Sequence, residues 1–289
     1  MAILLDFNPT VIAAVNAGHK EFGEDLNEDI IRNLVLNMIL SYRKQFGSKY
    51  GDLIICCDTG NAWRKEFFPF YKYSRKKTRE ESPLNWPLIF SSLDAIRNEL
   101  IEYMPYKVMA LPRCEADDII AVLSRYIVDY EPIEQGIDFD TQDVLILSRD
   151  KDFKQLQTTR HIVQWSPVDK KWLREPNAKE FLIEHIIRGD SGDGVPNMLS
   201  DDDSFVIKKR QSQIRTTFVE DVIANGVPPK HKAGYDRNKR LIDLTMVPQD
   251  LQEGIIAEYK NHTPNAKSKL LNYLIKYKLK NLYDNAQFF

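Results

Sequence analysis

The chain has 289 residues, 43% of them apolar, which is enough for one large domain or two moderate ones with a substantial core. Its 40 basic and 42 acidic residues nearly cancel, so net charge alone indicates no nucleic-acid partner. The three cysteines lack metal-ligand spacing, so we expect reduced core cysteines rather than a zinc site. The sequence has no apolar run of about 18 residues, which argues against a membrane span, and no basic, apolar leader, which argues against secretion. We therefore expect a cytoplasmic protein.

The N-terminal part of the chain alternates short apolar runs with segments of helical periodicity. Residues 3–5 predict a buried strand that ends at Asp6, and Phe7-Asn8-Pro9 is a turn signal. Apolar residues recur every four positions between 29 and 46, which predicts a helix, with Gly47 as its stop. Further strands are predicted at 53–57, 106–111 and 144–147, with a helix at 87–104.

Acidic residues stand at the carboxyl ends of these predicted strands. Asp6 and Asp58 end the first two strands, and Asp150 and Asp152 follow the fourth. Strands that alternate with helices indicate a mainly parallel sheet, in which ligands gather beyond the carboxyl ends of the strands. We therefore expect an α/β fold, with a mainly parallel twisted sheet flanked by helices, and these carboxylates at one edge of it.

A further acidic group, Glu115-Ala116-Asp117-Asp118, begins a segment whose apolar residues recur at helical spacing through Ile127. The N-terminal end of a helix favours each acid by up to about 1 kcal/mol. Two like charges about 4 Å apart, however, repel by roughly 4 kcal/mol at an effective dielectric constant near 20. If the strand-end carboxylates converge here, the cluster must either take up protons or bind cations. We interpret it as a divalent-metal site.

Residues 63–79 are both basic and aromatic. Of these seventeen residues, seven are Lys or Arg and six are aromatic. Basic side chains can neutralise phosphates and rings can stack on unpaired bases, which suits single-stranded nucleic acid. A solvated basic helix with some core aromatics is the alternative interpretation. Because the stretch follows the strand that ends at Asp58, it must emerge at the same edge as the acidic cluster.

Two later segments carry acids in loops. The turn at 189–196 has three glycines, and its Asp190 and Asp193 could point to the same side. The segment from Asp129 to Asp143 holds six acids and no basic residue, and we expect a solvated loop there rather than a metal site at Asp138 and Asp140. Further along we expect a solvated acidic tip at 201–203 and duplex-phosphate contacts from Lys208, Lys209, Arg210 and Arg215.

Beyond about Val168 the strand signals fade, and helices with loops are predicted. We place a domain boundary near residue 170, with an α/β core at 1–170 that includes a basic arch at 63–80, and a helical DNA-binding and C-terminal region at 171–289. The lysine-rich segment 267–280 predicts an amphipathic helix whose lysine face is exposed to solvent, rather than a helix that binds DNA. The aromatic end, residues 287–289, either packs onto the core, as we expect, or anchors a sliding clamp.

Four motifs resemble those of the flap endonuclease and 5′ to 3′ exonuclease family. In chain order they are Pro69-Phe70-Tyr71-Lys72 with Arg75 (P-x-Y-K-x-x-R), the E-A-D-D of 115–118, the D-x-D-x-x-Q-L of 150–156, and the G-D-x-x-D of 189–193. Each motif alone is weak, but together in this order they are specific, and the resemblance covers about residues 3–215. Trp63-Arg64, 79–81 and 164–172 look most like the bacteriophage ribonuclease H branch of the family.

The resemblance implies a PIN-like 5′-nuclease core and a two-metal site that takes Mg²⁺, with Mn²⁺ as a substitute. By position, the first metal ligands would be Asp6, Asp58, Glu115, Asp117 and Asp118. The second set, acting partly through water, would be Asp150, Asp152, Asp190 and Asp193. Lys72, Arg75 and Arg64 would contact the scissile phosphate. The residues implied to bind nucleic acid are Trp63, Tyr71, Lys76, Lys77, Arg79, Lys208, Lys209 and Arg210.

The sequence departs from the family pattern after Asp193. The family usually continues Asp-Asn-hydrophobic-Pro-Gly and then a Gly-x-Gly hairpin that holds duplex phosphates. Here Gly194 and Asn197 replace the expected Asn and Gly, and residues 198–212 contain no glycine. Duplex binding is therefore expected to differ, with side chains such as Lys208 and Lys209 in place of backbone contacts.

The function that these observations favour is a metal-dependent 5′ to 3′ exonuclease and flap endonuclease with ribonuclease H activity. Its expected partners are DNA and RNA·DNA hybrids with 5′ ends or flaps, and a sliding clamp or single-stranded-DNA-binding protein; we expect a monomer with no membrane contact. A non-catalytic structure-specific DNA-binding protein is the alternative, but a binder of phosphate gains nothing from nine repelling carboxylates. A metal-dependent phosphatase for small molecules would not need the basic, aromatic stretch.

Overall fold

The computed structural model describes residues 1–136 and 142–289, so Asp138 and Asp140 lie outside the described residues. The strands form one six-stranded sheet in the order β3-β2-β1-β4-β5-β6. The first five strands are parallel to one another, and β6 is antiparallel to β5. The strands are β1 (Ala2–Asp6), β2 (Asp52–Cys56), β3 (Lys107–Met109), β4 (Val144–Leu147), β5 (Ile162–Ser166) and β6 (Lys171–Leu173).

The structure confirms the four predicted strands and the α/β class, and it adds two strands that the pattern did not reveal. In β5 only alternate residues are fully buried, and two of these are the polar Gln164 and Ser166, so no apolar run marks it. The short, largely exposed β6 pairs with β5 at the edge of the sheet. The expectation that no strand follows Val168 is therefore wrong, because an edge strand needs no apolar run.

The helices next to the sheet are α1 (Phe7–Phe22), α2 (Glu28–Tyr50), α5 (Trp86–Tyr103) and α6 (Ala116–Arg125). The turn expected at Phe7-Asn8-Pro9 is wrong: a helix begins there directly after β1. Pro9 is tolerated because its missing N–H lies in the first turn, where no intrahelical acceptor exists. The predicted stop at Gly47 is also wrong, since α2 continues to Tyr50 and ends at Gly51, whose φ of 78° suits glycine.

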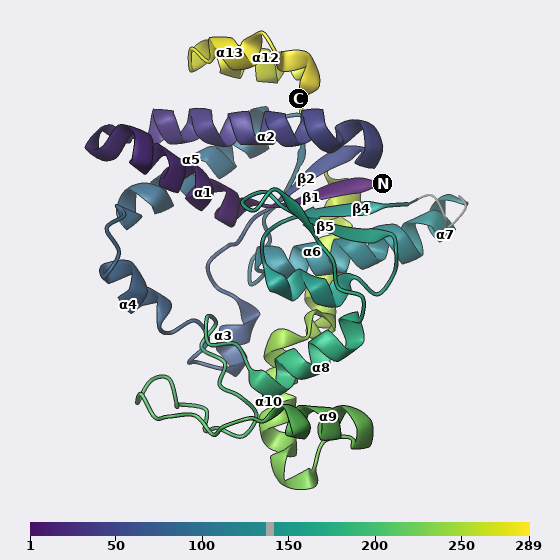
Figure 1. Ribbon diagram of the computed structural model, residues 1–289. Helices are drawn as coiled ribbons and strands as arrows, with labels where there is room; N and C mark the ends of the chain where they lie inside the picture. Colours follow the sequence, from purple (N-terminus) through teal and green to yellow (C-terminus); the bar gives the residue numbers. More distant parts are fainter. Residues whose placement is uncertain (137–141) are drawn as a thin grey trace.

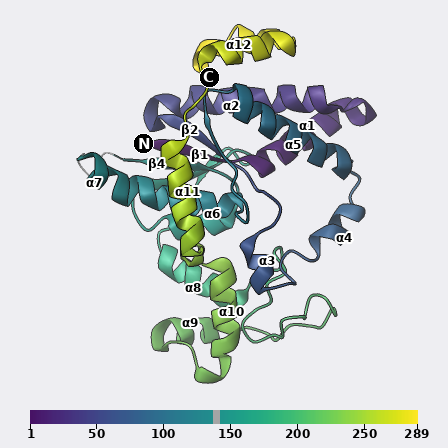
Figure 2. The ribbon, with the colours of Figure 1, turned by 180° about the vertical axis from the view of Figure 1, so that it is seen from behind.

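The two faces of the sheet are buried under different helices. Ile3, Leu5 and Ile55 face α1, α2 and α5, whereas Leu4, Ile54 and Ile146 face α6. The alternation follows from the two-residue period of a strand. Figures 1 and 2 show α1, α2 and α5 on one side of the sheet and α6 on the other. All three cysteines are buried and unpaired, which confirms them as core residues.

The C-terminal region forms a helical lobe and then returns to the core. The lobe contains α8 (Ala178–Arg188), α9 (Thr216–Asn225) and α10 (Lys232–Ile242), below the sheet in Figure 1. Helix α11 (Gln249–Asn261) then packs on the α6 face through Leu251 and Ile255. Helices α12 (Lys267–Lys276) and α13 (Lys280–Tyr283) pack on the opposite face. The domain boundary near residue 170 stays a prediction.

The last helices bear out the expected amphipathic pattern. Leu270 and Leu274 of α12 are buried, while Lys267, Lys269 and Lys276 are exposed. Phe289 is buried against Tyr106, so the aromatic end packs on the protein's own core. Among the described residues, none of the helices combines the length and apolar character that crossing a bilayer requires.

The basic stretch leaves the carboxyl edge after β2 as two short helices, α3 (Trp63–Phe67) and α4 (Arg75–Glu80). Figure 1 shows α3 beside the helical lobe, and α4 connecting it back toward α5 at a distance from the sheet. We call residues 63–80 the arch. The remaining short helices are α7 (Glu131–Gln135), the π-helical turn η2 (Tyr126–Tyr130) and the 3₁₀ turns η1 (Gly23–Asp25), η4 (Lys151–Leu156), η5 (Pro229–His231), η6 (Leu244–Met246) and η7 (Ala286–Phe288).

Candidate metal centre and the arch beside it

Carboxylates gather at the carboxyl edge of the sheet, where the strand pattern predicts them. Asp6 ends β1, and its Oδ2 accepts a hydrogen bond from Ser148 Oγ at 2.9 Å, just beyond β4. Asp58 follows β2, and its Oδ1 accepts from the backbone N–H of Ala116 at 2.7 Å. These bonds tie the ends of β1 and β2 to β4 and to the start of α6. The acids of three strands and one helix therefore occupy one site.

The carboxylates of this group raise one another's pKa. Burial raises the pKa of Asp6 well above its ordinary value, and the charges of Asp58 and Asp150 raise it further. Burial likewise raises the pKa of Asp117, with further contributions from Asp150 and Asp6. Burial and the charge of Glu115 raise the pKa of Asp58. Mutual repulsion of this kind is relieved when divalent cations bind between the carboxylates.

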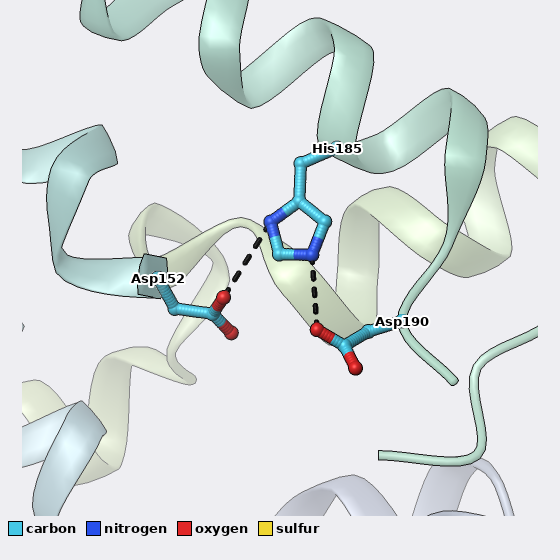
Figure 3. Close-up of side chains that lie close together, drawn as sticks. All are labelled: Asp152, His185 and Asp190. Atoms are coloured by element: carbon cyan, nitrogen blue, oxygen red, sulfur yellow. Dashed lines mark hydrogen bonds and ion pairs between the residues drawn. The ribbon is translucent and has the colours of Figure 1, made fainter. Parts of the chain in front are cut away.

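A second group contains Asp152, Asp190 and a histidine that the sequence analysis did not consider. Asp150 Oδ1 accepts from the backbone N–H of Asp152 at 2.9 Å and so caps η4. His185, in the last turn of α8, reaches both acids, as Figure 3 shows: its Nε2 lies 3.1 Å from Asp190 Oδ2 and its Nδ1 3.5 Å from Asp152 Oδ1. One ligand atom from each of the three lies within 4.8 Å of the others. The sequence does contain a signal for this contact, because His185 lies about one helical turn before Asp190.

The two acids of the second group differ in their pKa values. Burial and the charge of Asp150 raise the pKa of Asp152 to about 7. Burial also acts on Asp190, but hydrogen bonds from His185 and from Lys151 Nζ, at 2.8 Å, outweigh it and lower the pKa of Asp190 below its ordinary value. Asp190 is thus fixed as a carboxylate, whereas Asp152 readily takes a proton when no cation is present.

Cationic side chains of the arch reach the remaining acids. Lys72 Nζ lies 2.5 Å from Glu115 Oε1, and Arg75 contacts Asp193 Oδ1 at 2.6 Å. Burial alone would raise the pKa of Glu115, but the charges of Lys72 and Arg64 lower it. Two of the predicted metal ligands, Glu115 and Asp193, are therefore paired with Lys72 and Arg75, two of the three residues predicted to contact the phosphate.

Arg64 and Asp118 form a buried ion pair, and Arg64 also lines a small pocket with Asp117 and Asp152. Asp118 is fully buried; its Oδ2 accepts from the backbone N–H of Glu115 at 2.9 Å, and its Oδ1 lies 2.8 Å from Arg64. Arg64 also contacts Glu115 at 3.0 Å and donates to the carbonyl of Leu241. Asp118 Oδ2 thus has a hydrogen-bond donor and Oδ1 an ion-pair partner, and the guanidinium of Arg64 is buried. In the free protein both side chains contact Glu115, and the expected contacts of Arg64 with phosphate and of Asp118 with a metal stay predictions.

The two rings expected to stack on bases, those of Trp63 and Tyr71, are buried in the free protein. Trp63 is only 2% exposed, in the core on the α6 face, and Tyr71 is 4% exposed. The hydroxyl of Tyr71 hydrogen-bonds Glu115 at 3.0 Å and Asp193 at 2.9 Å. Base stacking by either ring therefore stays a prediction, and it would require the ring to become exposed.

The exposed cations of the arch line a cleft of about 690 Å³ beside the carboxylates. Its walls include Lys76 and Arg79 of the arch and Arg97 of α5, and the guanidinium of Arg79 lies over the rings of Trp86 and Phe90. The cleft reaches Asp58 and Glu115. Arg97 was not predicted, because on a helical pattern it reads as an ordinary surface residue. Lys77 of the arch is exposed and pairs with Glu81.

Side chains organise the segment that departs from the family pattern. Arg237 of α10 donates to the carbonyls of Pro196 and Asn197 at 3.0 Å, and the side chain of Asn197 donates to Ser212. Lys208, Lys209 and Arg210 are exposed at the end of this loop. Lys209 pairs with Asp201, so the acidic tip at 201–203 is partly neutralised.

The donors present fit divalent cations. Oxygen ligands dominate the site, as hard divalent cations require. Within the described residues, Asp152 Oδ1 and His185 Nδ1 are buried and have no hydrogen-bond partner. Buried polar atoms are normally satisfied, so two that face each other indicate a missing cation or proton.

Comparison of the sequence with known proteins identifies its family. Residues 23–183 match the N-terminal resolvase-like domain of 5′-3′ exonucleases, and residues 178–289 match the C-terminal domain of T4 ribonuclease H. The chain is 30% identical to the ribonuclease H of Enterobacteria phage T4 over 253 residues, which cover 83% of this chain and 80% of that protein. It is also 30% identical to the flap endonuclease Xni of Shewanella oneidensis over 145 residues, 47% of this chain and 48% of that protein.

The fold is also shared with a solved phage enzyme. The flap endonuclease of bacteriophage T5, in a complex with DNA and metal ions, superposes with a TM-score of 0.60 at 16% identity, covering 90% of this chain and 99% of that chain. The likeness confirms the PIN-like core and the helical C-terminal region. The chain belongs to the 5′ to 3′ exonuclease family of metal-dependent nucleases, on the side of that family that includes the T4 ribonuclease H.

Proposed function

We propose that this nuclease uses two divalent cations, Mg²⁺ in the cell, to hydrolyse phosphodiester bonds near the 5′ ends of RNA·DNA hybrids and DNA duplexes, including flaps. Its role would be the removal of RNA primers in phage DNA replication. The observation that carries the proposal is the convergence of Asp6, Asp58 and Asp117 with Asp150 beside the cations of the arch. Burial and the charges of neighbouring carboxylates raise the pKa of the first three.

The proposed ligands fall into two sets. Asp6, Asp58 and Asp117 hold the first cation, with Glu115 at its margin; Asp150, Asp152, Asp190 and Asp193 hold the second, partly through water. Bound cations of this kind lower the pKa of water and stabilise the entering and leaving oxygens of an in-line displacement. Asp118 and Arg64 act indirectly, because their contacts fix the carboxylate of Glu115.

Lys72 and Arg75 are the proposed phosphate contacts. In the free protein each is paired with an acid, Glu115 or Asp193. Cations bound to those acids would weaken the pairing and leave both side chains to a phosphate, whose developing charge they offset. Lys76, Lys77 and Arg79 then hold the single strand along the cleft, and Lys208, Lys209 and Arg210 contact the duplex.

Cleavage assays test this proposal directly. A 5′-labelled RNA·DNA hybrid and a 5′-flapped DNA duplex are incubated with the full-length protein in Mg²⁺, in Mn²⁺ and in EDTA. We expect short 5′ products that require the metal. Asp150→Asn should abolish them, whereas Asp25→Asn, in an exposed turn, should not.

Binding of the flapped duplex without cleavage in any metal would contradict the proposal and favour a non-catalytic binding protein, which the family membership does not favour. We extend the proposal to a monomer in the cytoplasm of the infected cell, with a helical region from about residue 171 that binds DNA. A sliding clamp or single-stranded-DNA-binding protein would be its replication partner. Sedimentation of the purified protein tests the monomer.

A further inference from the structure

His185 is a buried histidine held between two acids. Its side chain is 6% exposed, and the ring lies against Phe181 of the same helix, with centroids 5.7 Å apart. Figure 3 shows the ring pointing between η4 and the loop that follows α8, with one nitrogen toward each carboxylate. The orientation of the ring is therefore set by α8 and by both acids.

The contact with Asp190 determines which nitrogen carries the proton. Lys151 Nζ lies 2.8 Å from Asp190 Oδ2 and pairs with it as a carboxylate. A carboxylate only accepts hydrogen bonds, so the Nε2 facing it at 3.1 Å must carry a hydrogen. In the neutral ring, Nδ1 then presents a lone pair, as a histidine ligand does when its other nitrogen donates to a carboxylate.

The space beside Nδ1 is suited to a metal ion. Nδ1 and Asp152 Oδ1 are 3.5 Å apart, and both are buried without a hydrogen-bond partner among the described residues. Two lone pairs at this distance repel unless a cation or proton lies between them. Ligands about 2.0 to 2.1 Å from a tetrahedral metal are separated by roughly 3.3 Å, close to the separation seen here.

We propose that His185 is a nitrogen ligand of the second metal position and raises the affinity of that position for Mn²⁺, Co²⁺ or Zn²⁺ relative to Mg²⁺. Imidazole suits transition metals, whereas Mg²⁺ prefers an all-oxygen shell and dehydrates reluctantly. The inference rests on the proposed function, because it takes Asp152 as a ligand of that metal, with Asp190 orienting the ring through Nε2.

The competing account is a protonated ring. An imidazolium would donate to both acids and only hold them in place, without contact to the metal. The two accounts predict different effects of substituting His185. If His185 is a ligand, the variant protein loses affinity mainly for transition metals. If it only positions the acids, the variant loses affinity for all divalent cations alike.

Cobalt titration of the metal-free, full-length protein separates these accounts, because the visible absorption of Co²⁺ reports its ligands. We expect His185→Gln, whose amide can still donate to Asp190, to bind Co²⁺ at least about tenfold more weakly than the wild type. Its affinity for Mg²⁺, measured by competition, should change by less than roughly threefold. His161→Gln is the matched control, since His161 also contacts an acid, Asp143, but at the start of β5. Equal losses for Co²⁺ and Mg²⁺, or an unchanged cobalt spectrum, would overturn the inference.

A second measurement covers failure of the variant to fold, which thermal unfolding in EDTA would show. On the wild type, Zn²⁺ should shift the ¹⁵N resonance of His185 Nδ1, and an unshifted resonance with Zn²⁺ bound would overturn the proposal. Cleavage of the flapped duplex in Mg²⁺ is followed in parallel. If the wild type cleaves the duplex but His185→Gln binds Co²⁺ as the wild type does, only the inference is wrong. If the wild type cleaves in no metal but His185→Gln selectively loses Co²⁺ binding, the proposed function is wrong and the ligand assignment stands.

Discussion

The backbone N–H of Lys72 donates a hydrogen bond to the carbonyl of Asp193 at 2.7 Å. Through this bond the arch is held against the loop that follows α8, and the ammonium of Lys72 lies 3.5 Å from the carboxylate of the same aspartate. Lys72 has a φ of 56°, a left-handed conformation that a non-glycine residue seldom adopts. The placement of the phosphate-binding cations relative to the carboxylates therefore depends on a backbone contact between distant parts of the chain.

Gly194 explains one departure from the family pattern and tests this contact. Its φ is 72°, and a Cβ there would lie 2.9 Å from the carbonyl oxygen of Phe70 in the arch. We expect Gly194→Ala to lower the free energy of unfolding by about 1 to 3 kcal/mol more than Gly226→Ala, and to reduce flap cleavage. Gly226 is the matched control, because its φ is 86° but nothing lies within 4 Å. Equal urea midpoints for the two variants would contradict the assigned contact.

Arg64 is expected to matter for stability. Arg64→Met would leave the fully buried Asp118 without its ion pair, at a cost of about 3 to 5 kcal/mol. Adding Asp118→Asn should recover part of this loss, because the buried charge is then removed as well. Urea unfolding measures both effects, with Lys65→Met, at the exposed neighbouring position, as the control. A stable Arg64→Met that is inactive would instead restore direct phosphate contact by Arg64.

Lys72 is expected to act in the chemical step. Removal of one charge aimed at a developing oxyanion commonly lowers the turnover rate by about a hundredfold to a thousandfold. We expect a loss of this size in single-turnover cleavage by Lys72→Gln at saturating Mg²⁺. Lys267→Gln removes an exposed lysine of α12 and should leave the rate nearly unchanged. Equal rates for the two variants would remove Lys72 from the site.

Stability without metal should depend on pH through Asp152. Its pKa is raised from 3.8 to about 7, so between these values the folded protein holds a proton that the unfolded chain has released. This contribution to stability is present at low pH and is lost as the pH rises through about 7. Asp152→Asn cannot ionise, so in EDTA its melting temperature relative to the wild type should increase from about pH 5 to about pH 8. A difference that does not vary with pH would contradict the raised pKa.

The loop after Asp201 is expected to contact duplex phosphates. Each lost phosphate contact lowers the slope of log affinity against log salt by about 0.9. The triple variant Lys208→Gln, Lys209→Gln, Arg210→Gln should therefore show a shallower salt dependence of duplex binding. The matched control removes Lys267, Lys269 and Lys276, which are exposed on α12. If the control variant changes the slope and the loop variant does not, duplex DNA lies along the C-terminal helices instead.

The sequence by itself determined four of the six described strands and the main group of acids at their carboxyl ends. Strands β1, β2 and β4 are short apolar runs followed by Asp6, Asp58 and Asp150, and parallel strands bring their carboxyl ends to one edge. Asp117 lies at the same edge, because α6 begins after the carboxyl end of β3. These features are local or follow from topology, so they can be predicted before any side chain is placed.

Only the tertiary structure decided which side chains are open to a substrate. Trp63, Arg64 and Tyr71 belong to the same basic, aromatic stretch as Lys76 and Lys77, yet the first three are buried and the last two exposed. Residue type and spacing do not reveal this, because burial depends on how the arch meets the helical lobe and the loop after α8. The contact of His185 with the acids also depends on tertiary packing. Its neighbours, Asp152 and Asp190, come from separate segments that meet only when α8 packs against η4.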